Sequence, residues 1–577
     1  MTDETDPSIS LRTNRLKILS VGVVLLWGLI VVHLIGLHWT ESQRMKSRVD
    51  QQQTLVETIR ARPGDILDRN GQLLATSIDT ESLYAVPRRI ENFKTFAESI
   101  APLVNRDPDE LRHQLESQKE KDFFWLARRI DPKVADEIRA LDLSKETYGF
   151  DREFRRYYPN QALASHILGM RDIDGEGRGG MEQKYDELLR GKDGKRTLVR
   201  DARNRAIHLY EHENERVEHG QTIHLTLDIQ IQRFVEKQLD ELMTEWQPIG
   251  CTAVICEPKS GDILAIASRP TYNPADPTTF SDEAWLNRAV NWSYEPGSTM
   301  KPLVVAWALQ QDLVSVNSRF HGHWGEYRMG PRVLHDTHAY GEMSLAEVLI
   351  KSSNIGMAQI GERMTNAGLH QALQQFGFGY RTGLGLPGEL TGFVRPLNQW
   401  NHYSTGSIPM GQELTVTPLQ MLMAHAALAN RGEFQQPRLV LKAGHSTATE
   451  KSALLSMPLI DPVLADWVIR DPMRRVLTEG TGQRVDVDGL DIFGKTGTSQ
   501  VYDPELGTYS PTKTVCSFIC GIPTQNPELI VLVAVDQPTQ GTNHYGSNVA
   551  APAAVKILKK AYGLRHVDVA KQPKTIR

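Results

Sequence analysis

Cysteine is scarce in this sequence, and neither sign of charge is in clear excess. Four cysteines among 577 residues cannot build the disulfide framework on which small secreted domains depend. Lys and Arg together number 65 against 70 Asp and Glu, which leaves a net charge of −5. A near-neutral chain without a basic stripe excludes nucleic acid as the main partner. The sequence also lacks low-complexity tracts and repeats, so extensive disorder is excluded.

Long apolar runs are rare as well, and the one present lies near the N-terminus. Residues 18–37 contain no charged side chain. Twenty residues at about 1.5 Å each match the roughly 30 Å hydrocarbon core of a membrane. The exit from the run lacks the small-x-small pattern of a signal-peptide cleavage site. We therefore predict an uncleaved transmembrane anchor. Lys and Arg flank both of its ends, so the positive charges alone do not fix its orientation.

The remaining residues divide into two segments of different pattern. From about 61 to 220, short strand and helix signals alternate with turns. Beyond 220, helical periodicity covers 229–246, much of 299–470 and 548–562. Strand signals lie on both sides of these helices, at 252–256, 263–267, 490–501, 514–521 and 528–536. Strands at both ends with helices between them predict one α+β domain whose terminal strands share a sheet.

Three short motifs in the second segment carry candidate chemistry. They are Ser-Thr-Met-Lys at 298–301, Ser-Ser-Asn at 352–354 and Lys-Thr-Gly-Thr at 495–498. Each pattern alone predicts no more than a surface helix or a turn, because 510–513 also fits Ser-x-x-Lys and 315–317 also fits Ser-x-Asn. The order, spacing and context of the three motifs indicate a site. Ser-x-x-Lys followed by Lys-Thr-Gly is typical of penicillin-binding proteins and β-lactamases.

The first motif fits an activated nucleophile. Ser298 and Lys301 lie one helical turn apart, so the amine of Lys301 can reach the hydroxyl of Ser298. A serine becomes an effective nucleophile when a base removes its proton. Lysine is such a base only when burial or neighbouring cations lower its pKa. Pro302 disfavours helical backbone angles at Lys301, which we expect in or near the first turn of a helix.

The other two motifs fit substrate binding. Ser352 and Asn354 can supply a proton-relaying hydroxyl and an amide for a substrate peptide. Lys495 offers a fixed positive charge for a carboxylate, and Gly497 permits close approach of another backbone. Strand alternation places Lys495 and Thr498 on opposite faces. If both contact substrate, a bulge or twist at Gly497 is required.

All four cysteines lie on strands predicted to be central. We interpret them as small buried apolar residues. Pairing across strands is an alternative in an oxidising compartment. Zinc binding is the least favoured, because strand spacing does not match the knuckles of zinc ribbons. The residues are Cys251, Cys256, Cys516 and Cys520.

Residues 18–565 together resemble class B penicillin-binding proteins, the monofunctional D,D-transpeptidases of peptidoglycan synthesis. The N-terminal segments that carry the resemblance are 62–71, 156–159, 166, 169 and 180–182. The catalytic segments are 287–289, 295–302, 415–420 and 494–498. The resemblance implies an α+β chain with a single N-terminal transmembrane helix and an elongated α+β pedestal domain. A penicillin-binding transpeptidase domain follows, with a β-sheet flanked by helices as in serine β-lactamases.

The resemblance also implies an organisation and a location. The expected parts are a cytoplasmic tail at 1–17, the anchor at 18–37, a stalk at 38–60, a pedestal (dimerisation-like) domain at 61–220 and the transpeptidase domain at 221–577. The protein would cross the bacterial inner membrane once and hold its catalytic domain in the periplasm.

By the same resemblance, Ser298 is the acylated nucleophile and Lys301 is its general base. The full set implied to be catalytic is Ser298, Lys301, Ser352, Asn354 and Lys495. Those implied to bind substrate are Thr496, Gly497 and Thr498. The backbone N–H groups of Ser298 and Thr498 would form the oxyanion hole. No metal and no organic cofactor is implied.

The implied reaction is the cross-linking of peptidoglycan stem peptides. A D-Ala-D-Ala donor acylates the serine, and an amine of a neighbouring stem then accepts the acyl group. β-Lactams would act as inhibitors. The membrane, a SEDS-family glycosyltransferase and other cell-wall synthesis proteins are implied partners. A septal role of the FtsI type is expected, although 408–414 differs from the usual enterobacterial division-type segment. An elongation enzyme, a D,D-carboxypeptidase, a β-lactamase and a non-catalytic β-lactam-binding scaffold are the alternatives.

Overall fold

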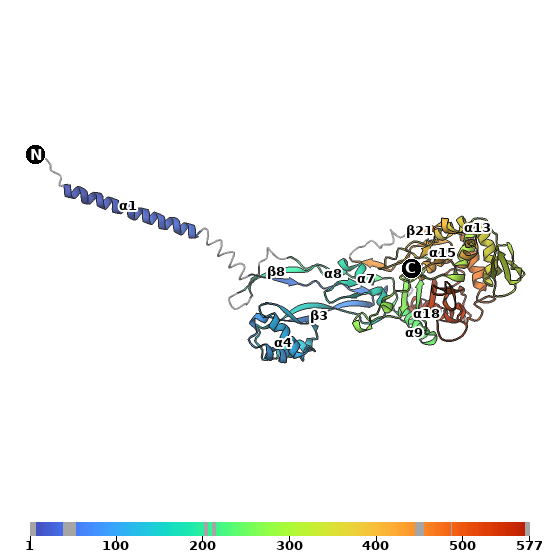
Figure 1. Cartoon of the computed structure of the whole chain (residues 1–577), viewed down its shortest axis with the longest axis horizontal. Coiled ribbons are helices and arrows are strands. Elements are labelled where there is room, and N and C mark those ends of the chain that lie inside the picture. The colour runs from blue at the N-terminus through green and yellow to red at the C-terminus, as the bar shows by residue number, and fades with distance from the viewer. Residues whose placement is uncertain are drawn as a thin grey trace. The chain divides into compact units, whose positions relative to one another are not determined.

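The computed structural model describes residues 7–38, 54–200, 206–209, 215–444, 455–485, 487 and 489–571. The chain divides into two compact units, 1–61 with 192–218 and 62–191 with 219–577 (Figure 1). Four predicted parts lie partly outside the described residues. The residues concerned are 1–6 of the tail at 1–17, 39–53 of the stalk at 38–60, 201–205 and 210–214 of the pedestal at 61–220, and 445–454, 486, 488 and 572–577 of the domain at 221–577.

The first unit contains the apolar helix and a small sheet. α1 (Pro7–Gly36) includes the stretch Asn14–Gly36, which is long and apolar enough to cross a membrane and overlaps the predicted anchor. β1 (Thr54–Ile59), β8 (Gly194–Arg200) and β9 (Ala206–Leu209) form an antiparallel sheet in the order β1-β8-β9. The end of the predicted stalk is therefore a paired strand.

The N-terminal part of the second unit is built on a six-stranded sheet. Its strand order is β20-β10-β2-β3-β4, and β5 also pairs with β3. The strands are β2 (Ile66–Leu67), β3 (Leu73–Ala85), β4 (Phe124–Ile130), β5 (Tyr148–Tyr157), β10 (Ile223–Leu225) and β20 (Val440–Ala443). β10 and β20 belong to the second sequence segment, so chain from the catalytic part completes the pedestal sheet.

Short helices cover one end of this sheet, and each begins at a residue suited to a helix N-terminus. α3 (Phe93–Ile100), α4 (Pro108–Ser117) and α5 (Pro132–Arg139) are capped by the side chains of Asn92, Asp107 and Asp131. Their apolar faces form one core with Leu83 of β3 and Leu126 of β4.

A buried ion network joins three of the pedestal segments that resemble the family, 62–71, 156–159 and 180–182. Glu182, in α7 (Gly180–Lys184), is fully buried and accepts from Arg156 Nε at 2.5 Å and Arg171 Nε at 2.7 Å. Arg156 Nη1 also donates to the carbonyl of Gly64 at 2.7 Å. Because an unpaired buried charge is costly, these segments are held in one arrangement.

The catalytic part is centred on a five-stranded antiparallel sheet in the order β12-β11-β24-β23-β22. The strands are β11 (Gly250–Cys256), β12 (Ile263–Arg269), β22 (Phe493–Asp503), β23 (Thr508–Ile522) and β24 (Leu529–Asp536). This confirms that strands from both ends of the domain share a sheet. In β24, Val531 and Val533 face one core while Ile530 and Leu532 face the other, as the two-residue period of a strand requires.

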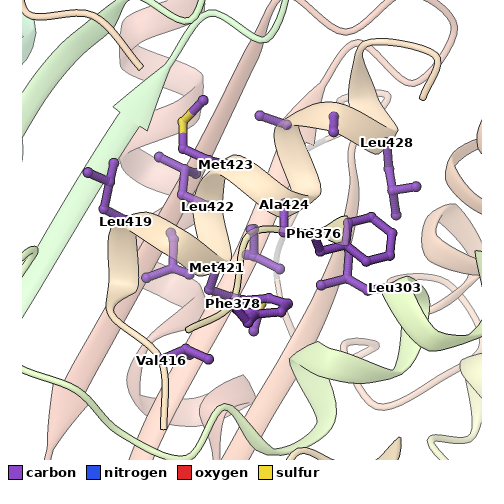
Figure 2. Close-up of a cluster of buried hydrophobic side chains, with 14 of the residues drawn as sticks. Leu303, Phe376, Phe378, Val416, Leu419, Met421, Leu422, Met423, Ala424 and Leu428 are labelled. Carbon is purple, nitrogen blue, oxygen red and sulfur yellow. The ribbon is translucent and has the colours of Figure 1, made fainter. Parts of the chain in front are cut away.

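Helices cover both faces of this sheet. α9 (Ile229–Trp246) and α18 (Ala551–Lys571) lie side by side on one face (Figure 1). The other face carries α15 (Pro418–Ala429), which packs against α11 (Lys301–Gln310), while α11 in turn contacts α13 (Asn354–Gln375). α15 is buried around its whole circumference, which explains its almost uniformly apolar sequence. Figure 2 shows part of this core, with Leu422 and Leu428 of α15 in one cluster with Leu303 and Phe376.

The remaining elements are short. The helices are α6 (Ser165–Leu168), α8 (Asp186–Arg190), α10 (Asp282–Trp285), α12 (Leu345–Ile350), α14 (Ser404–Ser407), α16 (Pro462–Val468) and α17 (Gly546–Val549). The strands form pairs: β6 (Met170–Arg171) with β7 (Gly177–Arg178), β13 (Arg319–His321) with β16 (Glu342–Ser344), β14 (Glu326–Met329) with β15 (Arg332–His335), β17 (Phe393–Val394) with β18 (Leu414–Thr415), and β19 (Glu433–Gln435) with β21 (Ser456–Pro458).

The cysteines are buried and free, which confirms their interpretation as core residues. Cys251, Cys516 and Cys520 face the core beneath α9 and α18, and Cys256 faces the opposite one. Burial raises the pKa of Cys251 and of Cys516 to about 12, so both are thiols at neutral pH.

Candidate active site

Ser298 lies in a tight turn that leads directly into α11. The turn is a 3₁₀ helix over Gly297–Met300, and Lys301 N–H donates to the carbonyl of Ser298. Lys301 has helical angles (φ −56°, ψ −44°), so the expectation drawn from Pro302 is wrong. Pro302 is within the first turn of α11. Backbone N–H groups in a first turn have no partner within the helix, so a proline there breaks no helical hydrogen bond and is tolerated. Lys301 does lie in that first turn, as predicted.

The side chain of Lys301 joins the first motif to the second. Its ammonium group is fully buried and donates to the carbonyl of Ser352 at 2.6 Å, to Ser352 Oγ at 3.2 Å and to Asn354 Oδ1 at 2.8 Å. Within the described part of the chain, no carboxylate forms an ion pair with it. The geometry therefore leaves a buried amine held by neutral oxygen atoms.

Lys495 brings the third motif to the same place. It is fully buried on β22, and its Nζ donates to Ser352 Oγ at 3.0 Å and to the carbonyl of Thr496 at 3.2 Å. Ser352 has a left-handed backbone (φ 58°), an uncommon conformation for a residue other than glycine. Two lysines thus share one hydroxyl, and the three motifs meet at Ser352.

Burial lowers the pKa of both lysines. Burial lowers the pKa of Lys301 to about 7, and the charge of Asp336 opposes that shift. The pKa of Lys495 lies well below its usual value, mainly through burial and also through its proximity to Lys301. Near pH 7, Lys301 therefore has a substantial neutral fraction.

The two duplicate patterns in the sequence behave differently. Ser510 and Lys513 both lie on β23, where the exposed ammonium of Lys513 pairs with Asp503 at 3.0 Å. Ser315 and Ser318 contact each other in the turn that follows α11. None of these residues lines the cleft that contains Ser298. Lys513 is exposed and paired with a carboxylate, whereas Lys301 is buried without an ion pair among the described residues. The duplicate patterns therefore lack the buried amine of the motif at 298–301.

The strand β22 carries the third motif without a bulge. Its register opposite β23 is continuous from Phe493 to Gln500, and the irregularity falls between Gln500 and Tyr502. Thr496 and Thr498 line the cleft, as alternation predicts for residues two apart. Lys495 reaches Ser352 because its long side chain bends back past the backbone at Thr496. The strand therefore has no bulge at Gly497, one of the two distortions expected there if Lys495 and Thr498 both contact substrate.

Gly497 has the close contact expected of it. A Cβ there would lie 2.9 Å from Thr299 Cγ2 and 3.1 Å from the carbonyl of Pro296, and closer still to Ser517 Oγ. These distances mean that the turn bearing Ser298 packs directly on β22. The absence of a side chain at Gly497 sets the separation between the first and third motifs.

Residues outside the three motifs also shape the site. Asp336 accepts from Ser353 Oγ at 2.5 Å, from Asn354 N–H at 2.5 Å and from Ile355 N–H at 3.1 Å, and so fixes the start of α13. The buried ring of His425 contacts the carbonyl of Thr299 through Nε2 at 2.8 Å. Sequence reasoning missed both, because no short motif connects them to the residues they hold.

The motifs open onto a cleft of about 940 Å³, at the upper end of the range for ligand sites. Its lining includes Ser298, Ser352, Asn354, Thr496 and Thr498. Among the residues that the structure describes, no group of three or more His, Cys, Asp or Glu is arranged to hold a metal ion. The arrangement provides a hydroxyl, a buried amine and several hydrogen-bonding side chains around one space.

Comparisons with known proteins agree with this geometry. Residues 251–559 match the family described as Penicillin binding protein transpeptidase domain, and 58–225 match the Penicillin-binding Protein dimerisation domain. The chain is 32% identical over 553 residues to "Probable peptidoglycan D,D-transpeptidase PenA" of Neisseria meningitidis, covering 94% of this chain and 92% of PenA. It is 28% identical over 513 residues to "Peptidoglycan D,D-transpeptidase FtsI" of Escherichia coli, covering 87% of this chain and 84% of FtsI.

Solved structures show the same fold. Penicillin binding protein 2X from Streptococcus thermophilus matches with a TM-score of 0.70 and 25% identity, covering 88% of this chain and 80% of that one. Penicillin binding protein 3 from Mycobacterium tuberculosis, complexed with aztreonam, matches with a TM-score of 0.67 and 25% identity, covering 89% of this chain and 98% of that one.

The chain belongs to the class B penicillin-binding proteins. It is a serine-type peptidoglycan D,D-transpeptidase, whose substrates are peptidoglycan peptides and whose site binds β-lactams. The apolar N-terminal helix and the membership of this family indicate a membrane-anchored protein.

Proposed function

We propose that Ser298 is the nucleophile of the transpeptidase and that Lys301 is its general base. The observation that carries this proposal is the burial of Lys301 among neutral oxygen acceptors, which lowers its pKa to about 7 although the charge of Asp336 opposes the shift. A neutral amine can take the Ser298 proton as the hydroxyl attacks the D-Ala-D-Ala carbonyl. The hydroxyl of Ser352, which accepts from the same amine, then relays the proton toward the leaving D-Ala, while Asn354 holds the amine through Oδ1 and helps to bind the substrate peptide.

The strand β22 is proposed to hold the substrate. Lys495, Thr496 and Thr498 bind the terminal carboxylate of the donor, and Gly497 keeps the strand close to the nucleophile. The backbone N–H groups of Ser298 and Thr498 stabilise the oxyanion that forms on the attacked carbonyl. Both residues line the same cleft, which supports this assignment.

The acyl-enzyme is proposed to react with an amine acceptor faster than with water. The purified full chain in detergent, given a D-Ala-D-Ala donor peptide and an amine acceptor, is expected to release D-Ala and form the cross-linked product. Ser298→Ala should abolish both. Release of D-Ala without cross-linked product at saturating amine would indicate a D,D-carboxypeptidase, and rapid hydrolysis of a β-lactam would indicate a β-lactamase.

We further propose that the enzyme acts in septal cell-wall synthesis during cell division, with a SEDS-family glycosyltransferase as partner. The similarity to the peptidoglycan D,D-transpeptidases FtsI and PenA supports this proposal. Depletion of the protein followed by microscopy tests the cellular role. Filamentous cells are expected, whereas spherical cells would assign the enzyme to elongation.

The proposed arrangement in the membrane follows the expected parts. Residues 1–17 are cytoplasmic, 18–37 cross the inner membrane, 38–60 form a stalk, 61–220 form the pedestal and 221–577 form the periplasmic transpeptidase domain. The apolar stretch at Asn14–Gly36 supports the position of the anchor.

A further inference from the structure

The cleft around Ser298 is lined by cations and, among the described residues, by no carboxylate. Arg332, Lys351 and Arg484 carry permanent positive charges there, and His335 and His338 add two titratable rings. Every other lining residue is neutral. A cleft lined by charges of one sign concentrates ligands of the opposite sign.

The nearest acidic groups are already engaged. Asp336 accepts three hydrogen bonds from the start of α13, so its charge is used within the fold. Glu347 pairs with Lys351 at 3.2 Å and also accepts from the N–H of Ser344 at 2.9 Å. Lys351 is therefore partly neutralised, while the other two lining cations have no such partner.

Arg332 and Arg484 are the cations left for a ligand. Arg484 is exposed and forms no ion pair or hydrogen bond within the part of the chain that the structure describes. Arg332 donates to Ser407 Oγ at 2.5 Å, which orients its guanidinium without neutralising it. Lys301 and Lys495 do not line the cleft, so the two arginines are the groups that would bind a charged ligand.

The size of the cleft indicates a ligand longer than a dipeptide. About 940 Å³ lies near the upper end of volumes that hold drug-sized ligands. The Lys-Thr-Gly-Thr strand accounts for one carboxylate, the terminal one. Arg332 on β15 and Arg484 before β22 line the same cleft from segments separate from that strand.

We propose that the cleft selects donor stem peptides whose residues before D-Ala-D-Ala keep free carboxylates, which Arg332 and Arg484 bind. This inference rests on the proposed transpeptidase site. A guanidinium binds a carboxylate through charge-assisted, paired hydrogen bonds. Converting the carboxylate to an amide keeps its shape but removes its charge, so amidated stems would be poor donors.

The test compares two N-acetylated pentapeptides that end in D-Ala-D-Ala. They are identical except that the carboxylates of the preceding residues are free in one and amidated in the other. The acylation rate of the full-length protein in detergent is measured by competition with a fluorescent penicillin. We expect the free peptide to react about tenfold faster, with the preference shrinking as salt rises. Arg484→Gln and Arg332→Gln should each reduce the preference about threefold.

Matched variants make the result specific. Arg319→Gln removes an exposed arginine of β13 that does not line the cleft, and should keep the full preference. Arg332→Lys keeps the charge and should retain more of the preference than Arg332→Gln. Equal rates for the two peptides, or an unchanged preference in both Gln variants, would overturn the inference while penicillin still reacts. Failure of penicillin and both peptides to react would instead overturn the proposed active site.

Discussion

Lys301 is the residue whose protonation controls the proposed chemistry. Burial favours the neutral amine, so its pKa falls to about 7 and the active form increases as pH rises through that value. We expect the rate of β-lactam acylation to rise about tenfold per pH unit below about pH 6 and to level off above about pH 8.

Two substitutions at Lys301 separate its base role from its charge. Lys301→Arg keeps a positive charge that is not lost in proteins, so it should lower acylation about 10²- to 10⁴-fold, as should Lys301→Ala. Circular dichroism of both variants controls for folding. A flat pH profile between about pH 5 and 8 in the native enzyme, or rapid acylation by folded Lys301→Arg, would remove Lys301 as the base.

Two buried histidines make a separate prediction at the residue scale. Burial lowers the pKa of His166 and His425 to about 4, below the usual 6.5. Between these values the unfolded chain binds protons that the folded chain does not, so stability falls as pH drops from 6.5 toward 4. Each histidine contributes up to about 3 kcal/mol to this loss.

The measurement is the urea midpoint of the full chain in detergent between pH 7 and 4. His425→Gln cannot titrate, so its midpoint should fall less steeply with decreasing pH than that of the native protein. Identical slopes for the two proteins would mean that His425 does not contribute.

At the scale of elements, the packing of the turn at 297–300 on β22 sets the active-site geometry. Gly497→Ala would place a Cβ 2.9 Å from Thr299 Cγ2 and force the two elements apart. We expect a loss of about 1–3 kcal/mol in stability and at least a tenfold fall in penicillin acylation. Gly507→Ala is the control for glycine replacement, because its Cβ would meet nothing within 4 Å, although its positive φ adds some strain. Equal acylation by Gly497→Ala and the native protein would show that this contact is not limiting.

The sequence was informative for elements whose pattern is local. The helix at 229–246, the hairpin at 252–267 and the apolar strand at 529–536 follow from periodicity, and the structure has all three. Ser353, which caps α13, lies within the second motif itself. These features depend on neighbours within a few residues, which is why a sequence pattern can predict them.

Features that depend on distant contacts could not be predicted in this way. The backbone of Lys301 is helical because of its place in α11, although the following proline alone argues otherwise. Lys495 reaches the site by the path of its side chain, which strand alternation does not describe. Arg332 and Arg484 join the cleft, and Asp336 fixes the start of α13, from segments that carry no motif. Convergence of the three motifs was predicted from their order, but their distances required the fold.

At the scale of the whole molecule, we propose that one apolar helix lies in the membrane and that both domains lie on its outer side. Protease added to intact spheroplasts should digest the chain beyond residue 40 and leave a short protected fragment that contains α1. Protection of the large domains would reverse the orientation, since the flanking charges do not fix it. Lysed spheroplasts are the control that every region can be cleaved.

The catalytic part also contributes two strands to the sheet of the pedestal. β10 and β20 complete the sheet built on β3, and Arg156, Arg171 and Glu182 lock the pedestal segments together. The domain that carries the nucleophile is thus anchored to the pedestal by strand pairing as well as by a linker. This explains why the segments that resemble the family extend well beyond the active site.

Labelling by a fluorescent penicillin tests the central claim most directly, with the duplicate pattern at 510–513 as the internal control. The native chain and Ser510→Ala should both be labelled covalently, because Lys513 is an exposed, ion-paired lysine and Ser510 lies outside the cleft. Ser298→Ala should carry no label while remaining folded. Persistent labelling of Ser298→Ala, or loss of labelling confined to Ser510→Ala, would contradict the assignment of Ser298 as the nucleophile.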